Sequence, residues 1–454
     1  MKSFGYCGNG TTVNGSITIE DGGQLYCEVA RGEVTVKKEI LGYEQRAMSN
    51  EPESSQLDAQ GSQLSWYTIA SPMKDTLTII TNSDYIPNSS FLIPNSEYDL
   101  YRYDEPTYTW QNAKNSAENG FNTIAPGRGY LYANAEDTTL EFTGMINTDE
   151  VTYNLTTDGD ILTGFHLVGN PFTHDITFAH LNATKGAELV NGYYVLNGEG
   201  AWGATLGSNE DDVIKVGQGV LVKAKTAGTL AISREPRAMS NEQRRNGSRL
   251  TAHSSMLITV SNAKHSDRAF IVFDKGVGLD KINHENENIP LLYIPMDDAD
   301  YAIAMMDMNV NEIPVNFETN VMGQYTISLR QDNCEFDELY LLDKQTGEKV
   351  NILENDYTFI ATSNDAPERF VLLKDNGQQT TDNSHFAYIN NGDIVVFDIE
   401  GKAQISIFDA MGRCLYKGSS SDETTRIANR FNTGVYVIQK VDDNGVKVQK
   451  LMID

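Results

Sequence analysis

The chain has 454 residues, with 63 Asp or Glu against 35 Lys or Arg, so its formal net charge is −28 at pH 7. Nucleic acid and anionic membrane surfaces repel so acidic a chain, which excludes both as partners. Apolar residues make up 40% of the sequence, enough for several cores, but no run approaches the roughly 20 apolar residues of a membrane-spanning helix. The length predicts about three domains.

Residues 1–45 have the pattern of short strands separated by Gly-rich turns. Residues 17–25 resemble the closing rung of a β-solenoid, as found in bacterial surface proteins. A single rung cannot bury its own apolar face, so it is expected to pack on a neighbouring domain or on further repeats. The alternative is an edge hairpin of the sandwich that follows.

The chain has four cysteines. Cys7 and Cys27 could form one disulfide. Cys334 and Cys414 lie in different predicted domains and are expected to be buried free thiols.

Residues 60–145 and 150–235 follow one pattern of strands, which predicts two related β-sandwich or jelly-roll modules. Each contains a strand that ends at Pro, a Tyr-rich strand, a Trp, a Gly-x-Gly strand and a short apolar strand. Residues 65–72 match 164–171, residues 126–132 match 216–222, and residues 140–142 match 230–232.

The hexapeptide Arg-Ala-Met-Ser-Asn-Glu occurs at residues 46–51 and again at 237–242. Both copies lie in polar stretches that precede a run of strands, as linkers do. We interpret them as a duplicated linker, and cleavage by an Arg-specific protease is the alternative.

Residues 250–375 contain further apolar strands and are predicted to form another β-sandwich domain. The sequence at 343–347 predicts a hairpin turn between two of these strands. The polar stretch 374–383 then separates this domain from the end of the chain.

Residues 384–454 predict a small β-sandwich. Apolar residues alternate at Ile405 and Ile407, and the runs are bounded by Gly, Asn or Asp. Residues 409–412 predict a hairpin turn in which Gly412 takes a positive φ. Residues 435–438 are apolar on both faces, as in a central strand.

Three motifs in this segment resemble the C-terminal sorting domain of proteins that Bacteroidetes export by the type IX secretion system. The resemblance implies an immunoglobulin-like domain that is recognised by the secretion machinery and typically removed after export. It also implies that the rest of the chain is secreted or attached to the outer membrane at the cell surface. An ordinary C-terminal β-sandwich with no sorting role is the alternative. The residues that carry the motifs are Asp409, Gly412, Arg413, Gly434, Tyr436, Gly445 and Lys450.

Residues 1–10 lack the apolar segment of a signal peptide. A protein with an export address also needs an entry signal. We therefore expect this chain to be the C-terminal part of a longer protein.

The sequence offers few candidates for metal binding or catalysis. Acidic runs at 210–212 and 297–300 could bridge Ca²⁺, although such runs are usually solvated loops. Recognised catalytic motifs are missing, so we expect no enzymatic activity and no cofactor apart from loosely held Ca²⁺. Four side chains could converge on Zn²⁺, namely His166, His174, Asp175 and His180.

Aromatic residues at matching positions of the two modules could form a platform for sugar rings or for a protein surface. Residues two apart on a strand share a face, so the first module would present two tyrosines together. The alternative is that this face is the core. The candidate platform comprises Tyr101, Tyr103 and Trp110 in the first module, and Tyr194 and Trp202 in the second.

Together these features predict an all-β chain of several β-sandwich or jelly-roll-like modules in tandem, ending in an immunoglobulin-like sandwich. We expect a non-catalytic region that serves adhesion or binding, with a host protein, matrix protein or glycan as ligand. The alternative is an accessory or carbohydrate-binding region of a larger secreted protease or polysaccharide-degrading enzyme.

Overall fold

The computed structural model forms two compact units, residues 1–374 and residues 375–454. The residues that the structure describes are 4–7, 16–27, 32–42, 65–81, 88–115, 120–184, 186–207, 212–235, 254–297, 299–334, 336–374, 386–390, 393–397, 399, 401–409, 412–422, 424–442 and 445–453. Both copies of the repeated hexapeptide lie outside these ranges.

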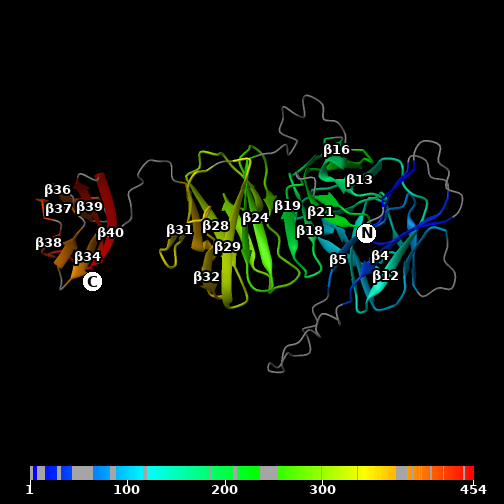
Figure 1. The fold of residues 1–454 in the computed structure, drawn as a ribbon, viewed down its shortest axis with the longest axis horizontal. Coiled ribbons are helices and arrows are strands. Elements are labelled where there is room, and N and C mark those ends of the chain that lie inside the picture. Colours follow the sequence, from blue (N-terminus) through cyan, green and yellow to red (C-terminus); the bar gives the residue numbers. More distant parts are fainter. Residues whose placement is uncertain are drawn as a thin grey trace, which may run out of the picture. The chain divides into compact units, whose positions relative to one another are not determined.

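Every regular element of the described residues is a β-strand or a one-turn 3-10 helix, and the strands form sheets that pack face to face (Figure 1). The expected all-β fold of tandem sandwich modules is therefore confirmed. The 3-10 helices are η2 (Glu105–Thr107), η3 (Phe178–His180) and η4 (Pro367–Arg369).

The first strands pair as successive turns of a parallel coil. β1 (Phe4–Cys7) runs parallel to β3 (Gln24–Cys27), and β2 (Ile17–Ile19) runs parallel to β4 (Val34–Ile40). Stacked rungs of a β-solenoid produce this pairing of each strand with the next but one. β4 also pairs with a strand of the following module, so a domain boundary at residue 45 would separate strands of one sheet.

We expect Cys7 and Cys27 to form a disulfide in an oxidising compartment. Their side chains lie outside the described residues, but the backbone register of β1 and β3 places the two residues opposite each other. Neighbouring strands lie about 4.8 Å apart, which falls within the Cα separation that a disulfide spans. Alkylation followed by intact-mass measurement should block two thiols in the oxidised protein and four after reduction. Four blocked thiols before reduction would contradict the pairing.

The first module runs from β4 to β12 and contains two sheets. The larger has the order β10-β6-β7-β12-β4-β2 and the smaller the order β5-β11-β8-β9. Both sheets contribute side chains to one core, in which the Phe91 and Phe142 rings stack. Its remaining strands are β5 (Tyr67–Ala70), β6 (Leu77–Thr81), β7 (Ser90–Ile93), β8 (Tyr98–Asp104), β9 (Thr109–Asn112), β10 (Thr123–Ile124), β11 (Gly129–Asn134) and β12 (Thr138–Gly144).

The second module runs from β13 to β22. Its sheets have the orders β13-β22-β16, β15-β20 and β14-β21-β18-β19, with β17 on the edge of β21. The strands are β13 (Val151–Leu155), β14 (Phe165–Gly169), β15 (Ile176–Thr177), β16 (Leu181–Thr184), β17 (Glu188–Leu189), β18 (Tyr193–Leu196), β19 (Trp202–Thr205), β20 (Val213–Ile214), β21 (Gly219–Thr226) and β22 (Gly228–Ile232).

The two modules make reciprocal contacts through positions that match in the sequence. The N–H of Ala70 donates to the carbonyl of Gly217 (3.1 Å), and the N–H of Gly169 donates to the carbonyl of Gly127 (3.0 Å). A Cβ on Gly219 would lie 3.2 Å from the Cα of Gly129, so the backbones approach closely here. The Gly-x-Gly strands thus form the contact between the modules.

Glu105 adds a polar contact between the same two modules. Its buried carboxylate accepts hydrogen bonds from the Thr156 hydroxyl and from the N–H groups of Asp158, Gly159 and Gly164. Burial alone would raise the pKa of Glu105, but these bonds outweigh it and hold the pKa below its ordinary value. The loop before β14 is therefore fastened to the first module.

The third module is built from strands β23 to β33. Its sheet has the order β31-β30-β33-β28-β26-β27-β24-β23-β29-β32, with β25 on β27, and it surrounds one core. β30 and β31 pair around residues 343–347, which confirms the predicted hairpin turn. The strands are β23 (Ser255–Ser261), β24 (Ser266–Val272), β25 (Leu279–Asp280), β26 (Leu291–Met296), β27 (Ala299–Met305), β28 (Glu312–Glu318), β29 (Gly323–Asp332), β30 (Leu339–Asp343), β31 (Lys349–Asn351), β32 (Tyr357–Ala361) and β33 (Phe370–Lys374).

One apolar cluster runs through all three modules of the first unit. It includes Leu131 of the first module, Phe165 and Trp202 of the second, and Ile282 and Ile303 of the third. β19 lies beside β24 in Figure 1, where the second and third modules meet. The three modules therefore share a continuous core.

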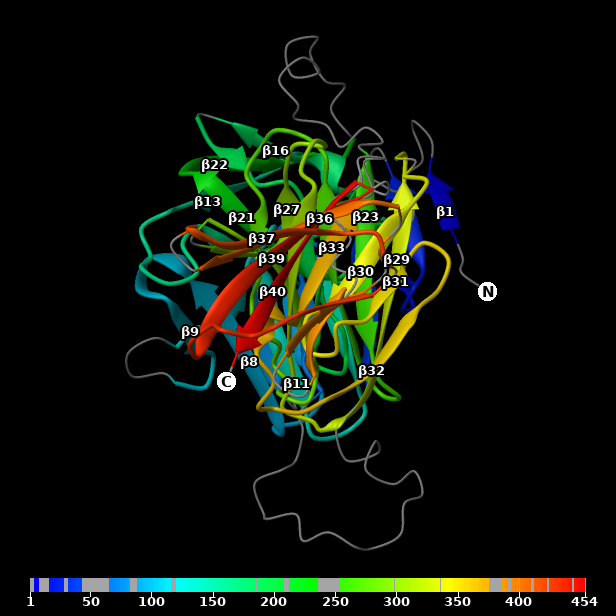
Figure 2. The same ribbon diagram turned by 90° about the vertical axis from the view of Figure 1, so that its left-hand side faces the viewer.

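The second unit is a small two-sheet sandwich of the immunoglobulin-like type. Its sheets have the orders β34-β35-β38 and β37-β36-β39-β40, and Figure 2 shows the second of these side by side. A core of Phe386, Ile394, Ile407, Ile438 and their neighbours lies between them. The strands are β34 (Ala387–Asn390), β35 (Asp393–Val396), β36 (Ala403–Asp409), β37 (Cys414–Ser420), β38 (Thr425–Ile427), β39 (Gly434–Asp442) and β40 (Gly445–Ile453).

Candidate functional site

The turn between β36 and β37 is closed by Asp409 and Arg413. The Asp409 carboxylate accepts bonds from the main-chain N–H of Arg413 (2.9 Å) and from its Nε (2.7 Å). Gly412 has a φ of +78° with open space around it, a conformation that favours glycine. The predicted hairpin turn with a positive φ at Gly412 is thus confirmed.

The other motif residues of this unit hold β39 and β40 in the sandwich. The Tyr436 side chain is buried, and its hydroxyl donates to the carbonyl of Asn432 (2.8 Å). Gly434 begins β39 and pairs with Ile453 near the end of β40, while Gly445 begins β40. The last two strands are therefore paired along their full length.

The outer face of this sheet has a shallow depression of about 510 Å³ beside the turn. Asp409 and Gly412 line it from the turn, and Lys450 lines it from β40. Its floor is apolar, because Phe408, Val435 and Val437 point outward while their neighbours fill the core. Three of the seven motif residues therefore gather at one surface feature.

The platform residues of the second module do not form an exposed surface. Tyr194 is 0% exposed and Trp202 is 3% exposed, so in the second module this face belongs to the core, which is the alternative that the sequence left open. The third module covers them, which the local sequence could not indicate. We call Tyr194, Leu196 and Trp202 the Trp202 surface.

The Trp202 surface is joined to the third module by hydrogen bonds as well as by apolar contacts. The main-chain N–H of Trp202 donates to Nδ1 of His284 (3.0 Å), and its indole N–H donates to the Glu285 carboxylate (3.0 Å). The Tyr194 hydroxyl donates to the carbonyl of Asp280 (2.6 Å). A loop with two acceptor side chains thus covers this surface.

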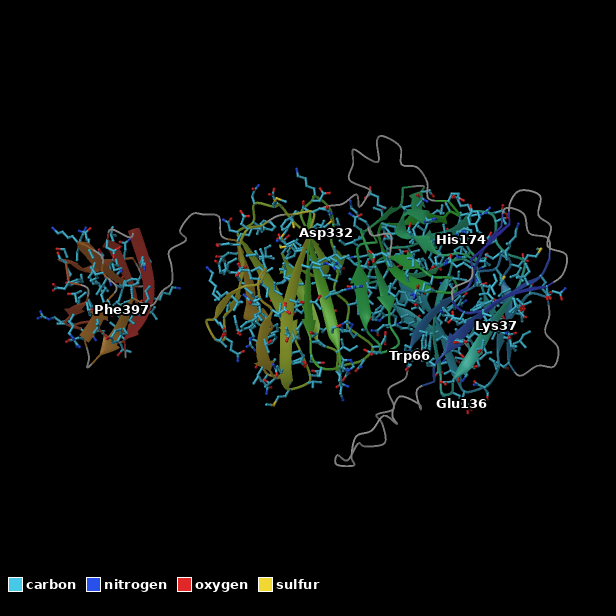
Figure 3. All side chains as sticks on the ribbon, viewed as in Figure 1. Lys37, Trp66, Glu136, His174, Asp332 and Phe397 are labelled. Carbon is cyan, nitrogen blue, oxygen red and sulfur yellow. The ribbon has the colours of Figure 1, made fainter. Side chains whose placement is uncertain are left out.

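The platform residues of the first module are only partly covered. Tyr103 is buried and Tyr101 is half-buried, but Trp110 is 38% exposed and the neighbouring Tyr108 is 42% exposed. The Tyr103 ring lies 5.1 Å from Trp110 and 6.3 Å from Tyr108, measured between ring centroids. Trp66, labelled in Figure 3, packs edge-on against Tyr101 at 5.8 Å. We call Tyr101, Tyr103, Tyr108 and Trp110 the Trp110 surface.

A buried ionic cluster lies behind the loop that covers Trp202. The Asp267 carboxylate pairs with the Lys281 ammonium, accepts the main-chain N–H of Leu292 (2.7 Å), and lies 3.4 Å from Nε2 of His284. That last distance is long for a hydrogen bond, so we treat it as an electrostatic contact. These residues are scattered in sequence and match no motif, which is why sequence reasoning missed them.

The histidines proposed as Zn²⁺ ligands do not converge. His166 bonds to Thr156 just after β13, His174 (Figure 3) to the carbonyl of Asp175, and His180 to Thr177 just before η3. Within the described residues, no three His, Cys, Asp or Glu side chains are grouped as a metal site requires. Burial lowers the pKa of each imidazole, that of His180 to about 4.

The acidic runs proposed for Ca²⁺ lie partly outside the described residues, which omit 208–211 and 298. In the second run, burial raises the pKa of Asp300, and the charge of Glu318 raises it further. Of the cysteines predicted to be buried thiols, Cys334 is partly buried and Cys414 is exposed. The expectation for Cys414 is corrected, because β37 is the end strand of its sheet in the part of the chain that the structure describes.

The C-terminal sandwich, with its Asp–Arg turn and its fully paired last strands, has the features of a terminal sorting domain. Residues 388–454 match the family model described as the secretion system C-terminal sorting domain. The predicted type IX sorting domain is thereby confirmed, and the chain carries an address for export to the cell surface or the medium. Recognition by the type IX secretion machinery follows from the same match.

One solved structure with local similarity is described as PorZ, an essential bacterial surface component of the type-IX secretion system of Porphyromonas gingivalis. The identity is 14%, the similarity covers 30% of this chain and 22% of that one, and the TM-score is 0.15. Among curated proteins, none matches the sequence. In the part of the chain that the structure describes, no helix is long and apolar enough to cross a membrane.

Proposed function

We propose that this chain is the non-catalytic binding region of a protein that Bacteroidetes export by type IX secretion, and that it serves adhesion at the cell surface or in the medium. The sorting domain at residues 388–454 is the observation that carries the proposal. The acidic composition supports an exposed location, because a high net charge keeps a surface protein soluble.

The upstream modules supply the binding surfaces in this proposal. The first two share the strand order of one sheet (β5-β11-β8-β9 and β14-β21-β18-β19), the Gly-x-Gly contacts and the aromatic positions, so we infer that they are copies of one unit. One copy holds the third module, and the other exposes Tyr108 and Trp110. A second candidate function is an accessory role beside a secreted protease or polysaccharide-degrading enzyme, favoured by the ability of exposed rings to stack on sugars.

We expect deletion of residues 384–454 in the native host to retain the remaining chain in the cell. The first unit has its own cores and should stay folded. Fractionation of cells and medium, followed by immunoblotting, would measure the change. The undeleted chain in a mutant strain without type IX secretion would give the reference for complete loss of export. A signal-peptide reporter fused to residues 384–454 should gain export. Continued export of the deleted chain would refute the proposal.

A further inference from the structure

The Trp110 and Trp202 surfaces occupy equivalent places in their modules. In the first module Leu131 pairs with Tyr101, and Tyr103 pairs with Trp110. In the second module Leu221 pairs with Tyr194, and Leu196 pairs with Trp202. Trp110 and Trp202 therefore stand at the same register position of the corresponding edge strands, β9 and β19.

The edge strands also present the same main-chain groups. On β9, the N–H of Ala113 bonds to Leu100, and hydrogen-bonded and open pairs alternate along an antiparallel ladder. The pair Tyr103–Trp110 is then an open one, and the N–H of Trp110 points away from β8. On β19, the N–H of Trp202 points outward in the same way and meets His284. Trp110 thus has the same two hydrogen-bond donors that Trp202 uses, its main-chain N–H and its indole N–H.

The two surfaces differ in what covers them. The loop at 280–286 supplies an imidazole to the main-chain N–H of Trp202 and a carboxylate to its indole. Among the described residues, Trp110 has neither partner and remains 38% exposed. The hydroxyl of the adjoining Tyr103 is buried without a hydrogen-bond partner in the same part of the structure. Such an unpaired group is costly unless a ligand or water meets it.

We propose that the Trp110 surface docks a protein loop that presents a carboxylate beside a second hydrogen-bond acceptor, as residues 280–286 do on the Trp202 surface. The inference rests on the proposed binding function and names the partner class for it. The surface continues the apolar cluster that already joins the three modules, so a docked loop would extend an existing interface. Its partner is another protein, because the matching loop of this chain is engaged with Trp202.

The internal comparison favours a protein loop over a sugar or a second copy. A neutral sugar would stack on the ring faces but would supply no carboxylate to the indole N–H of Trp110, as Glu285 does to that of Trp202. A second copy joined through β9 would pair two edge strands and present no carboxylate to the indole. Both alternatives are outcomes of the test below.

The test uses the full-length chain labelled with ¹⁵N and a synthetic peptide with the sequence of residues 279–289. The chain has three Trp residues, so three indole N–H signals are expected, and Trp110→Phe assigns one of them. The peptide should shift the Trp110 signal saturably and leave the Trp202 signal unchanged, because the latter site is filled. A peptide with His284→Ala and Glu285→Gln should bind at least about tenfold more weakly, since it lacks both the imidazole acceptor and the charged carboxylate acceptor.

Tyr108→Ala serves as a second variant and should weaken peptide binding without altering the Trp202 signal. Tyr388→Ala, which removes an exposed ring from the second unit, is the matched control and should leave binding unchanged. The inference is overturned if the Trp110 signal stays fixed at millimolar peptide, or if the substituted peptide binds equally well. The inference is also overturned if the Trp110 signal shifts with neutral oligosaccharides but not with the peptide, or if it shifts only when the chain self-associates. Export by the sorting domain is measured separately and does not depend on these results.

Discussion

Replacing Asp267 with alanine should destabilise the first unit by about 3–5 kcal/mol, the range for removing one partner of a buried ion pair. The side chains of Asp267 and Lys281 are 1% and 5% exposed, so the ammonium would stay buried without its counter-charge. The N–H of Leu292 would also lose its acceptor. Urea denaturation of the full chain, followed by tryptophan fluorescence, would measure the loss, since Trp202 contacts the same loop.

Asp280→Ala is the matched control for this prediction. Asp280 also pairs with a lysine, Lys223, but its side chain is 35% exposed. Solvent screens such a pair, so its loss should cost no more than about 1 kcal/mol. Equal effects of the two substitutions would show that burial does not determine the contribution of Asp267.

The contribution of Asp267 should also depend on pH. Burial alone would raise the pKa of Asp267, but the Lys281 charge and the His284 imidazole outweigh it and hold the pKa below its ordinary value of about 3.9. A carboxylate with a lowered folded pKa stabilises the protein above its unfolded pKa, and this stability is lost as the pH falls through the folded pKa. The stability difference between the wild type and Asp267→Asn should therefore shrink below about pH 4. A difference that stays constant down to acid pH would contradict the assignment.

The sorting domain could be predicted from the sequence because its signals are local. The turn at Asp409–Arg413 is fixed by residues four apart, and the last strands carry their own alternation. The depression beside the turn could not be predicted, because it depends on which face of β39 points outward. That choice is made by the core on the other side of the sheet.

Whether the residues of the aromatic platform are exposed or buried depends on contacts between residues far apart in the chain. Trp110 and Trp202 follow similar local patterns, yet one is exposed and the other is covered by residues more than 80 positions later, including His284 and Glu285. The matching strands indicate that the Trp110 and Trp202 surfaces are equivalent. They do not indicate which of the two surfaces the third module covers. Position in the assembled unit, and not local sequence, decides whether a matching residue belongs to a core or to a surface.

The same reasoning explains the repeated Gly-x-Gly pattern. In the sequence it marks a strand and says nothing about a partner. In the structure the second glycine of each pattern, Gly129 or Gly219, lies where the two modules meet, and a Cβ there would come within 2.8–3.3 Å of backbone from the other module. The residue type at Gly129 and Gly219 is thus set by the junction, whereas Gly127 and Gly217 take a positive φ that favours glycine.

Gly169→Ala should destabilise the first unit by about 3 kcal/mol, at the upper end for overpacking. The new Cβ would lie 2.2 Å from the Cβ of Ala70 and 2.9 Å from the carbonyl oxygen of Arg128, so the two modules must move apart. The bond from the N–H of Gly169 to Gly127 would be strained by the same movement. Urea denaturation would measure the change. Gly323→Ala is the control, because nothing lies within 4 Å of a Cβ there, and its effect should stay within about 0.5 kcal/mol.

Adding Ala70→Gly to Gly169→Ala should restore most of the lost stability. Ala70 and Gly169 are matching positions of the two modules, and the methyl group of Ala70 is the nearest atom to the added one. The double variant therefore moves one methyl group across the junction without changing its total volume, and volume-conserving exchanges are tolerated best. A double-mutant cycle would give a large favourable coupling between the two sites. Additive losses would mean that the Arg128 carbonyl, and not the Ala70 methyl group, limits how closely the modules approach.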